Sequence, residues 1–382
     1  MTEFLENRSN ICRILCGYLQ YNISLFVCQA SMIKTESDRG GFIMENQKKI
    51  LVLGGTGAMG VYLVPELLRM GYRVDVVSLD DIKSDNPNLT YTVGNARDEN
   101  VIRPILENGG YDGIVDFMIY STELFTKRYK LLLENTKHYI YLSSYRVYAD
   151  EQHPITESAP RLLDVSDDKE MLETDTYALA KARQEDILSA SSFKNWTAIR
   201  PAITFSKRRY QLVTMEANTV VVRAREGKKL LLPAPARYVQ ATMTWAGDMA
   251  KMISRLLFNP EAYCERITVS TAEHHTWDEV ASYYKELIGL EVEWIDEMEY
   301  LRMVNPDHPM RDARWQLEYD RMYDRIVDNS KVLRICGMKQ SDLTPIHDAL
   351  ATEFAELPAD ATFPPDKGLN ARMDAWLAEH AN

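Results

Sequence analysis

The chain has 382 residues, of which 46% are apolar and 26% charged, an ordinary composition for a globular protein with one large domain or two modest ones. Its formal net charge of −12 argues against a surface for nucleic acid or anionic membranes, and no apolar run is long and charge-free enough to span a bilayer. Only two of the five cysteines lie beyond residue 43, which is typical of a reducing compartment, so we expect a cytoplasmic protein without a disulfide framework.

The first 43 residues differ from the rest of the chain. The stretch 11–33 is moderately apolar but is interrupted by the polar residues Arg13, Gln20, Asn22 and Gln29. The residues before it are charge-balanced rather than basic, which is wrong for a secretory signal. We therefore expect residues 1–43 to be a poorly ordered extension, with a membrane anchor as the alternative.

Residues 50–60 read Ile-Leu-Val-Leu-Gly-Gly-Thr-Gly-Ala-Met-Gly, an apolar strand that breaks into a turn with glycines spaced three apart. Gly54 permits a tight turn, Gly57 lets the backbone approach a phosphate, and Gly60 lets the following helix pack closely on the strand. The amino end of that helix offers free N–H groups and a positive dipole end to an anion. The turn therefore predicts binding of a dinucleotide pyrophosphate; a purely structural strand–helix turn is the alternative.

Beyond this turn, strands alternate with helices as a parallel sheet demands. The strands are expected at 49–54, 73–78, 90–93, 113–118, 138–143 and 196–200. Right-handed crossovers make a doubly wound, Rossmann-type α/β sheet the simplest topology. After residue 205 the alternation stops. We expect a dinucleotide-binding domain at 44–205, and a smaller, mainly substrate-binding lobe at 206–382 with some segments returning to the sheet.

Two groups of polar residues lie where such a sheet binds ligands. The strand at 138–143 ends in Ser143 and Ser144, at the edge where ligands of parallel sheets bind. A predicted helix at 177–190 begins Tyr177-Ala-Leu-Ala-Lys181, which puts a phenol and an ammonium on one helical face. That spacing is common by chance, so it becomes informative only because it follows the glycine turn and the Ser-Ser strand end.

Together these features resemble the short-chain dehydrogenase/reductase superfamily, specifically its extended branch of epimerases, dehydratases and reductases. The resemblance covers residues 48–350. Besides the glycine turn and the Tyr-Lys pair, it includes Val147-Tyr148, Arg200-Pro201 and Asp328-Asn-Ser-Lys331.

The resemblance implies a catalytic role for Ser144, Tyr177 and Lys181. A free tyrosine has a pKa near 10, so a neighbouring lysine ammonium would favour the phenolate that takes a proton from a carbinol. Ser144 would hold the substrate oxygen, and Lys181 would also bind the nicotinamide ribose. The alternatives are an ordinary surface pair for the tyrosine and lysine, and a strand-end hydroxyl satisfying backbone groups for the serine.

The resemblance also assigns the residues that hold the cofactor. They are Gly54, Thr56, Gly57, Ala58, Met59, Gly60, Ser78, Asn95, Ala96, Phe117, Lys181 and Pro201. Ser78 stands where NAD-preferring relatives place an acid, but Asp80 and Asp81 follow and would repel a 2′-phosphate, so NAD is favoured over NADP. Phe117 is bulkier than the usual small residue beside the cofactor.

The implied function is an NAD(P)-dependent epimerase or oxidoreductase acting on a carbinol carbon of a sugar-like substrate, a class that includes nucleotide sugars. Ile203 and Ala241 replace the usual nucleotide-sugar contacts, which favours the alternative of a one-way ketone or aldehyde reductase. Tyr145 replaces the acid of sugar dehydratases, so dehydration is disfavoured. A non-catalytic nucleotide sensor or RNA-associated protein is the second alternative.

Three further expectations concern partners and ions. A homodimer is expected only by analogy with the family. The neighbouring His274 and His275 lack a carboxylate at ligand spacing, so no metal site is predicted. The basic run at 207–209 would meet a substrate phosphate or, as the alternative, form a solvated loop.

Overall fold

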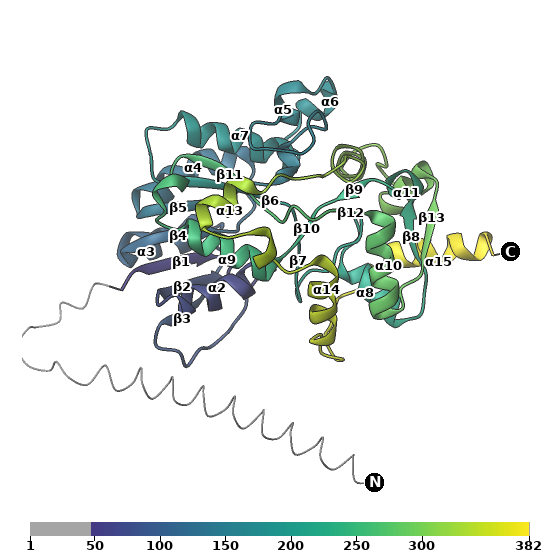
Figure 1. Ribbon diagram of the computed structural model, residues 1–382, viewed down its shortest axis with the longest axis horizontal. Coiled ribbons are helices and arrows are strands. Elements are labelled where there is room, and N and C mark those ends of the chain that lie inside the picture. Colours follow the sequence, from purple (N-terminus) through teal and green to yellow (C-terminus); the bar gives the residue numbers. More distant parts are fainter. Residues whose placement is uncertain (1–46, 382) are drawn as a thin grey trace, which may run out of the picture. The chain divides into compact units, whose positions relative to one another are not determined.

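The computed structural model describes residues 47–381, so the predicted extension at 1–43 lies outside the described residues. Within them, the chain builds a seven-stranded sheet in the order β11-β6-β5-β4-β1-β2-β3, and every neighbouring pair is parallel (Figure 1). The strands are β1 (Lys49–Leu53), β2 (Arg73–Ser78), β3 (Leu89–Val93), β4 (Tyr111–Asp116), β5 (Thr136–Leu142), β6 (Trp196–Pro201) and β11 (Glu265–Val269). The predicted doubly wound α/β fold is confirmed.

Alternating apolar side chains of these strands feed two separate cores. Ile50 and Val52 point to one face of β1, while Leu51 and Leu53 point to the other, as the period of two in a strand requires. The first face packs on α2 (Gly60–Arg69), α9 (Ala246–Leu256) and α13 (Ser330–Cys336). The second packs on α3 (Glu99–Gly109), α4 (Thr122–Glu134) and α7 (Tyr177–Ala190). Both faces are therefore covered, which is why the strands read as nearly continuous apolar runs.

The chain leaves the sheet after β6 and returns to it much later. Strand β11 pairs with β6 from Glu265↔Thr197 to Val269↔Pro201. Helices α9 and α13, which cover one face, also come from residues after 206. The sheet is thus completed by segments that alternate in sequence with elements outside the sheet.

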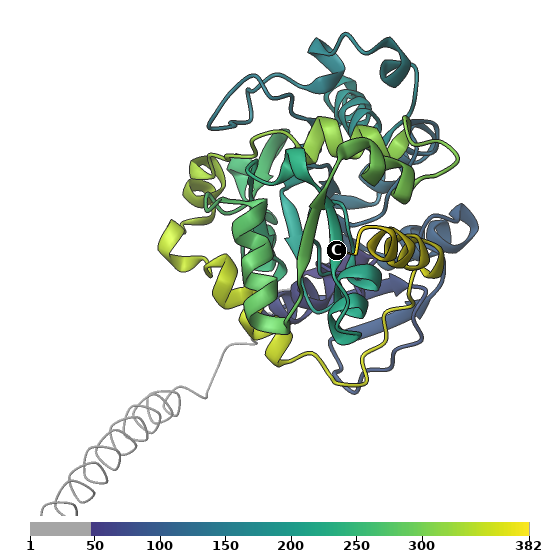
Figure 2. The same ribbon diagram turned by 90° about the vertical axis from the view of Figure 1, so that its right-hand side faces the viewer.

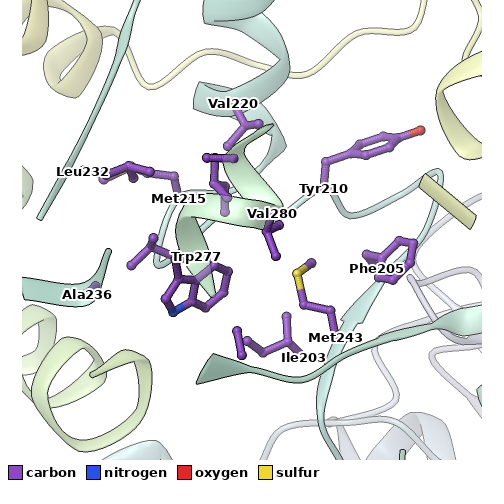
Figure 3. Close-up of a cluster of buried hydrophobic side chains, with 14 of the residues drawn as sticks. Ile203, Phe205, Tyr210, Met215, Val220, Leu232, Ala236, Met243, Trp277 and Val280 are labelled. Atoms are coloured by element: carbon purple, nitrogen blue, oxygen red, sulfur yellow. The ribbon is translucent and has the colours of Figure 1, made fainter. Parts of the chain in front are cut away.

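Outside this sheet, the chain builds three two-stranded sheets and five further helices around a separate core. Figure 2 views these elements from the side on which the C-terminus lies. The strands pair as β7 (Ile203–Phe205) with β10 (Met243–Trp245), β8 (Leu230–Pro233) with β13 (Val292–Ile295), and β9 (Gln240–Ala241) with β12 (His275–Thr276). The helices are α8 (Ala217–Arg225), α10 (Trp277–Ile288), α11 (Glu297–Val304), α14 (Ile346–Ala355) and α15 (Lys367–Glu379). The buried ring of Trp277 lies among Ile203, Met215, Met243 and Val280 (Figure 3).

Local signals in the sequence explain where α10 begins and ends. Thr276 accepts a hydrogen bond from the backbone of Glu279, whose side chain accepts from the Thr276 backbone, so the two form a capping box. Gly289 ends the helix in the left-handed conformation, with φ of 71°. Thr276 is therefore the N-cap of the helix.

Short elements complete the fold. They are α5 (Leu162–Val165), α6 (Lys169–Leu172), α12 (Asp312–Gln316), the π-helical η4 (Leu317–Arg321), and the 3-10 segments η1 (Tyr145–Val147), η2 (Ala234–Ala236), η3 (Pro260–Ala262) and η5 (Gln340–Asp342). Among the helices of residues 47–381, none has the length and apolar character that a membrane crossing needs.

Candidate active site

The glycine turn has the backbone shape that a bound phosphate requires. Gly54 adopts φ of 77°, a conformation that residues with a Cβ rarely reach. A Cβ on Gly60 would lie 2.5 Å from the Cα of Gly55 and closer still to its carbonyl group. Gly60 is therefore required by contact with the turn itself, rather than with the strand as the sequence suggests. The turn leads directly into the amino end of α2, where N–H groups are available to an anion.

A cavity of about 360 Å³ lies against this turn, at the carboxyl ends of β1, β2 and β3. Most of the residues predicted to hold the adenosine side of the cofactor line it: Gly54, Thr56, Gly57, Ser78, Asn95, Ala96 and Phe117. We call it the nucleotide cavity. Its lining fits a dinucleotide, because the glycine turn leaves the space that side chains would fill.

Ser78 does not present a free hydroxyl to the nucleotide cavity. Its Oγ lies 2.6 Å from Thr56 Oγ1 and accepts a hydrogen bond of 3.1 Å from the backbone N–H of Asp80. The exposed Asp80 also lines the cavity. The acid that is missing at the end of β2 is therefore available two residues later.

A second cavity, of about 440 Å³, adjoins the first, since Phe117 lines both. We call it the catalytic cavity. Among the predicted residues it is lined by Met59, Phe117, Ser144, Tyr177 and Pro201. The rest of its wall comes from Ile119, Leu142, Ser143, Tyr145, Arg146, Ala202, Ile203, Thr204, Arg209, Gln211, Glu216, Gln316 and Arg321.

The two adjacent serines have different surroundings. Ser143 donates a hydrogen bond of 2.5 Å to Glu185 Oε1, and Arg200 holds the same buried carboxylate through contacts of 2.8 and 2.6 Å. The arginine and Ser143 keep the pKa of Glu185 below its usual range although burial raises it. Ser144 instead accepts a hydrogen bond of 3.2 Å from the backbone N–H of Arg146. Its hydroxyl proton remains available to a ligand in the cavity.

Tyr177 is the first residue of α7, and Lys181 lies one turn further into that helix. The lysine is fully buried and donates a hydrogen bond of 2.5 Å to the carbonyl of Leu142, the last residue of β5. Its ammonium lies 5.7 Å from the centre of the Tyr177 ring. Burial lowers the pKa of Lys181 to about 8, although the carboxylates of Asp116 and Glu185 favour its charged form.

Tyr177 stands between two cavities. With Ser144 it lines the catalytic cavity, and with Lys181 it lines a separate cavity of about 370 Å³. The phenol, the ammonium and the serine hydroxyl are thus brought to one region, but the lysine does not line the catalytic cavity. Ala58 and Gly60 line neither that cavity nor the nucleotide cavity.

Several polar residues of the catalytic cavity were not predicted as site residues, among them two arginines and a glutamine. Arg146 places its guanidinium 5.1 Å from the centre of the Tyr177 ring. Buried Gln211 donates a hydrogen bond of 2.8 Å to Glu216, while its Oε1 has no donor among the described residues. Arg321 comes from η4. The position of Arg146, two residues after Ser144, was the only sequence signal for any of them.

Other candidate residues are held elsewhere. Arg237 pairs with Asp278 at 2.9 Å and does not line the catalytic cavity, while Arg209 does. The expectation that His275 lacks a nearby carboxylate is wrong, because Glu273 lies 2.8 Å from its Nε2. Within residues 47–381, no cluster of three or more His, Cys, Asp or Glu side chains could hold a metal ion.

Comparison with known proteins shows to which family the chain belongs. A model of the NAD dependent epimerase/dehydratase family matches residues 50–268, more than half of the chain. The chain belongs to this family. The resemblance of the sequence to the extended short-chain dehydrogenases/reductases is thereby confirmed.

One curated relative of the chain is the chloroplast stem-loop binding protein of 41 kDa b from Arabidopsis thaliana, which is 22% identical to it over 251 residues. The match spans 62% of each protein, so the chain covers less than two thirds of that relative.

Solved structures of similar fold include Bordetella bronchiseptica WbmH in complex with NAD+ (16% identity, TM-score 0.62, 83% of this chain and 100% of that one). Thermus thermophilus UDP-glucose 4-epimerase, in complex with NAD, is 18% identical with a TM-score of 0.59 over 82% of this chain and 100% of that one. The UDP-N-acetylglucosamine 4-epimerase of Bacillus cereus is 17% identical with a TM-score of 0.59 over 84% and 99%. At these identities the similarity establishes the fold.

Proposed function

We propose that the protein is an NAD-dependent enzyme that moves a hydride at a carbinol carbon of a sugar-like substrate, as an epimerase does through transient oxidation. The observation that carries the proposal is the adjacency of two cavities. Ser144 and Tyr177 line the catalytic cavity, and Phe117 joins it to the nucleotide cavity at the glycine turn. A dinucleotide that spans both would bring its reactive ring to the phenol.

The residues of the nucleotide cavity suit NAD better than NADP. The turn at Gly54 and Gly57 and the amino end of α2 would receive the pyrophosphate. Asp80 would accept hydrogen bonds from ribose hydroxyls and would repel a 2′-phosphate. When bound, the nicotinamide supplies the hydride acceptor and donor. Met59 and Pro201, which line the catalytic cavity, would contact that end of the cofactor.

Three side chains of the protein would move and hold the substrate proton. The Tyr177 phenolate takes the proton of the carbinol hydroxyl and returns it later, a contribution of roughly 100- to 10,000-fold for a well-placed base. Ser144 donates its free hydroxyl proton to the same oxygen. The buried ammonium of Lys181, 5.7 Å from the ring centre, places a positive charge beside the phenol.

Part of the catalytic cavity suits a polyhydroxylated substrate. Gln211 Oε1 is a buried acceptor without a donor among the described residues, and leaving such an atom unpaired is costly. A substrate hydroxyl would satisfy it. Ile203, on the same cavity, offers no polar contact to a nucleotide, which keeps a one-way ketone or aldehyde reductase as the alternative reaction.

The proposal is tested by purifying the full chain and identifying retained nucleotide by mass spectrometry, followed by assays on a panel of sugars and nucleotide sugars. We expect NAD to be bound, and epimer formation without net cofactor consumption; a reductase would consume one nicotinamide per product. Tyr177→Phe should bind NAD normally and lose at least about 100-fold in turnover. A protein that neither binds NAD nor turns over any carbinol would refute the proposal.

The curated relative's name makes RNA association the second candidate. The net charge of −12 opposes it, because phosphate backbones are bound mainly by Lys and Arg. Retention of a labelled RNA stem-loop at physiological salt, unaffected by Tyr177→Phe, would favour this candidate over the enzyme.

A further inference from the structure

The wall of the catalytic cavity that includes Arg146 and Arg321 holds a concentration of buried positive charge. Three arginines surround the single carboxylate of Asp320: Arg146 at 3.2 Å, Arg325 at 3.3 Å, and Arg321, which contacts it directly. The carboxylate is 1% exposed, and Arg321 and Arg325 are 3% and 1% exposed. One negative charge therefore stands against three positive charges in a region with little water.

Two of these arginines make several hydrogen bonds to the protein. Arg321 donates to the carbonyl of Val213 at 2.7 Å and to the hydroxyl of Tyr145 at 3.1 Å. Arg325 donates to the carbonyls of Tyr148 and Tyr319 at 3.1 and 3.2 Å. All three guanidinium nitrogens of Arg325 thus have partners, whereas Nη1 and Nε of Arg321 are engaged and its other terminal nitrogen makes no hydrogen bond within residues 47–381. Both side chains hold η1 and η4 together around Asp320.

Arg146 is different. It is the most exposed of the three, with 17% of its side chain accessible, and it lines the catalytic cavity. Its guanidinium forms an ion pair with Asp320 and lies over the Tyr177 ring, but it donates no hydrogen bond within residues 47–381. Burial lowers the pKa of Arg146, and the neighbouring Arg321 lowers it further, so its charge is only partly compensated. A buried guanidinium with free donors is costly unless an anion pairs with it.

We propose that Arg146 binds an anionic group of the substrate, a carboxylate or a phosphate, carried close to the carbon on which Tyr177 acts. This inference rests on the proposed function and names its substrate class. A guanidinium can hold either group through two parallel hydrogen bonds. Because Arg146 lies 5.1 Å from the Tyr177 ring centre and two residues from Ser144, the anion must be within a few bonds of the reacting carbinol.

The remaining charges on the cavity are consistent with this assignment. Arg209 is paired with Glu216 at 3.0 Å, so these two side chains cancel each other at the cavity wall. Asp320 lies behind Arg146 and is shared with two other arginines, so it does not neutralise the cavity. A neutral sugar would leave the charge of Arg146 unmatched, whereas a sugar acid or sugar phosphate would complete it.

The test compares glucose, glucuronate and glucose 6-phosphate, three ligands that share the same ring and differ only at the exocyclic carbon C6. Each is titrated into the NAD-saturated full chain by calorimetry, which needs no turnover. We expect an acidic member to bind at least about tenfold more tightly than glucose, as hydrogen bonds to charged groups do. A preference for glucuronate identifies the anion as a carboxylate, and a preference for glucose 6-phosphate identifies it as a phosphate.

The variants assign the effect to one side chain. Arg146→Gln should bind all three ligands equally, and Arg146→Lys should keep part of the preference. Arg73→Gln removes the same charge from an exposed position at the start of β2, outside the cavity lining, and should leave the preference unchanged. NAD affinity and thermal unfolding of each variant serve as the check of folding.

The outcomes separate this proposal from the proposed function. Equal binding of glucose and both acids by the wild-type chain, or a preference that survives in Arg146→Gln, overturns the anion site. Should Arg146→Gln fail to fold, the wild-type preference and its partial retention in Arg146→Lys decide the question. Failure of the hydride-transfer proposal would instead appear as absence of NAD binding or turnover, whatever the calorimetric preference.

Discussion

The two neighbouring cavities are built in opposite ways. The nucleotide cavity is lined by residues 54–118, at the ends of strands that follow one another in sequence, and its shape depends on backbone and glycine. The catalytic cavity is lined by Met59, Phe117 and Ile119 and by four later, separated stretches, around residues 142–146, 177, 201–216 and 316–321, and it depends on the placement of polar side chains. Local sequence therefore specifies the cofactor end, while long-range packing specifies the substrate end. Substitutions in each region test this contrast.

The largest effect is expected at the glycine turn. In Gly60→Val, the new side chain would collide with the Gly55 backbone, so the turn must move. We expect NAD affinity, measured by calorimetry, to fall by more than about 100-fold, equivalent to over 2.7 kcal/mol. Gly71→Ala is the matched control, since no atom lies within 4 Å of its added Cβ. It should cost stability through its φ of 86° but leave NAD affinity unchanged. Normal NAD binding by Gly60→Val would show that the turn is not the cofactor's seat.

The adjacent serines offer the next test, because they lie side by side with different partners. Ser144→Ala removes the free hydroxyl and should lower turnover by roughly 100- to 1,000-fold with little change in the unfolding temperature. Ser143→Ala removes a hydrogen bond from the buried Glu185 carboxylate and should cost about 1–3 kcal/mol of stability. Turnover and thermal unfolding of both variants check this pairing. The reverse result would mean that the wrong serine has been assigned to the substrate.

A third prediction concerns the far end of the sheet from the cavities. His138, near the start of β5, accepts a hydrogen bond of 2.8 Å from the backbone N–H of Phe258 through Nδ1, and Nε2 lies 2.8 Å from Thr197 Oγ1. Burial lowers the pKa of His138 to about 4. Below the usual histidine value of about 6.5, the unfolded chain binds a proton that the folded chain does not.

Stability should therefore fall as the pH drops from about 6.5 toward 4, by up to about 1.4 kcal/mol per pH unit from this residue. His138→Asn, whose amide oxygen can accept the Phe258 N–H, should flatten the dependence; the exposed His274→Asn should not. Urea unfolding at several pH values measures the slope. An unchanged slope in His138→Asn would place the acid sensitivity elsewhere.

The smallest expected effect is on cofactor choice. Asp80→Ala removes the only carboxylate that residues 47–381 place in the lining of the nucleotide cavity, so repulsion of a 2′-phosphate should weaken. We expect the preference for NAD over NADP, measured as a ratio of dissociation constants, to fall by about tenfold. Asp81→Ala, one residue outside the lining, is the control. An equal change in both variants would mean that general surface charge, rather than Asp80, sets the preference.

Sequence reasoning succeeded where local rules decide the structure. The apolar runs located the strands because both faces of this sheet are covered, and the glycine spacing located the turn because only glycine fits there. The predicted position of the fourth strand was wrong for a physical reason. The fourth strand was expected at 113–118 but spans Tyr111–Asp116, because Phe117 and Met118 are apolar for another purpose: they line the nucleotide cavity.

What sequence reasoning missed depends on contacts between distant segments. Arg146 and Asp320 are separated by more than 170 residues, and nothing in either local sequence indicates that they meet. Similarly, the hydroxyl of Ser78 is engaged by Thr56, and the ammonium of Lys181 by the carbonyl of Leu142. Motif spacing identified Ser78 and Lys181 as candidates but could not show which of their polar atoms remain free.

The late return of β11 also governs how the protein can be made. A nascent chain that has left the ribosome only as far as residue 205 has β6 as an open edge, whose unpaired N–H and C=O groups invite association with other chains. Truncation after the sixth strand should therefore give an aggregating product rather than a working cofactor module. Any shortened version intended for expression or crystallisation has to extend through Val269, and through α13 if that side of the sheet is to stay covered.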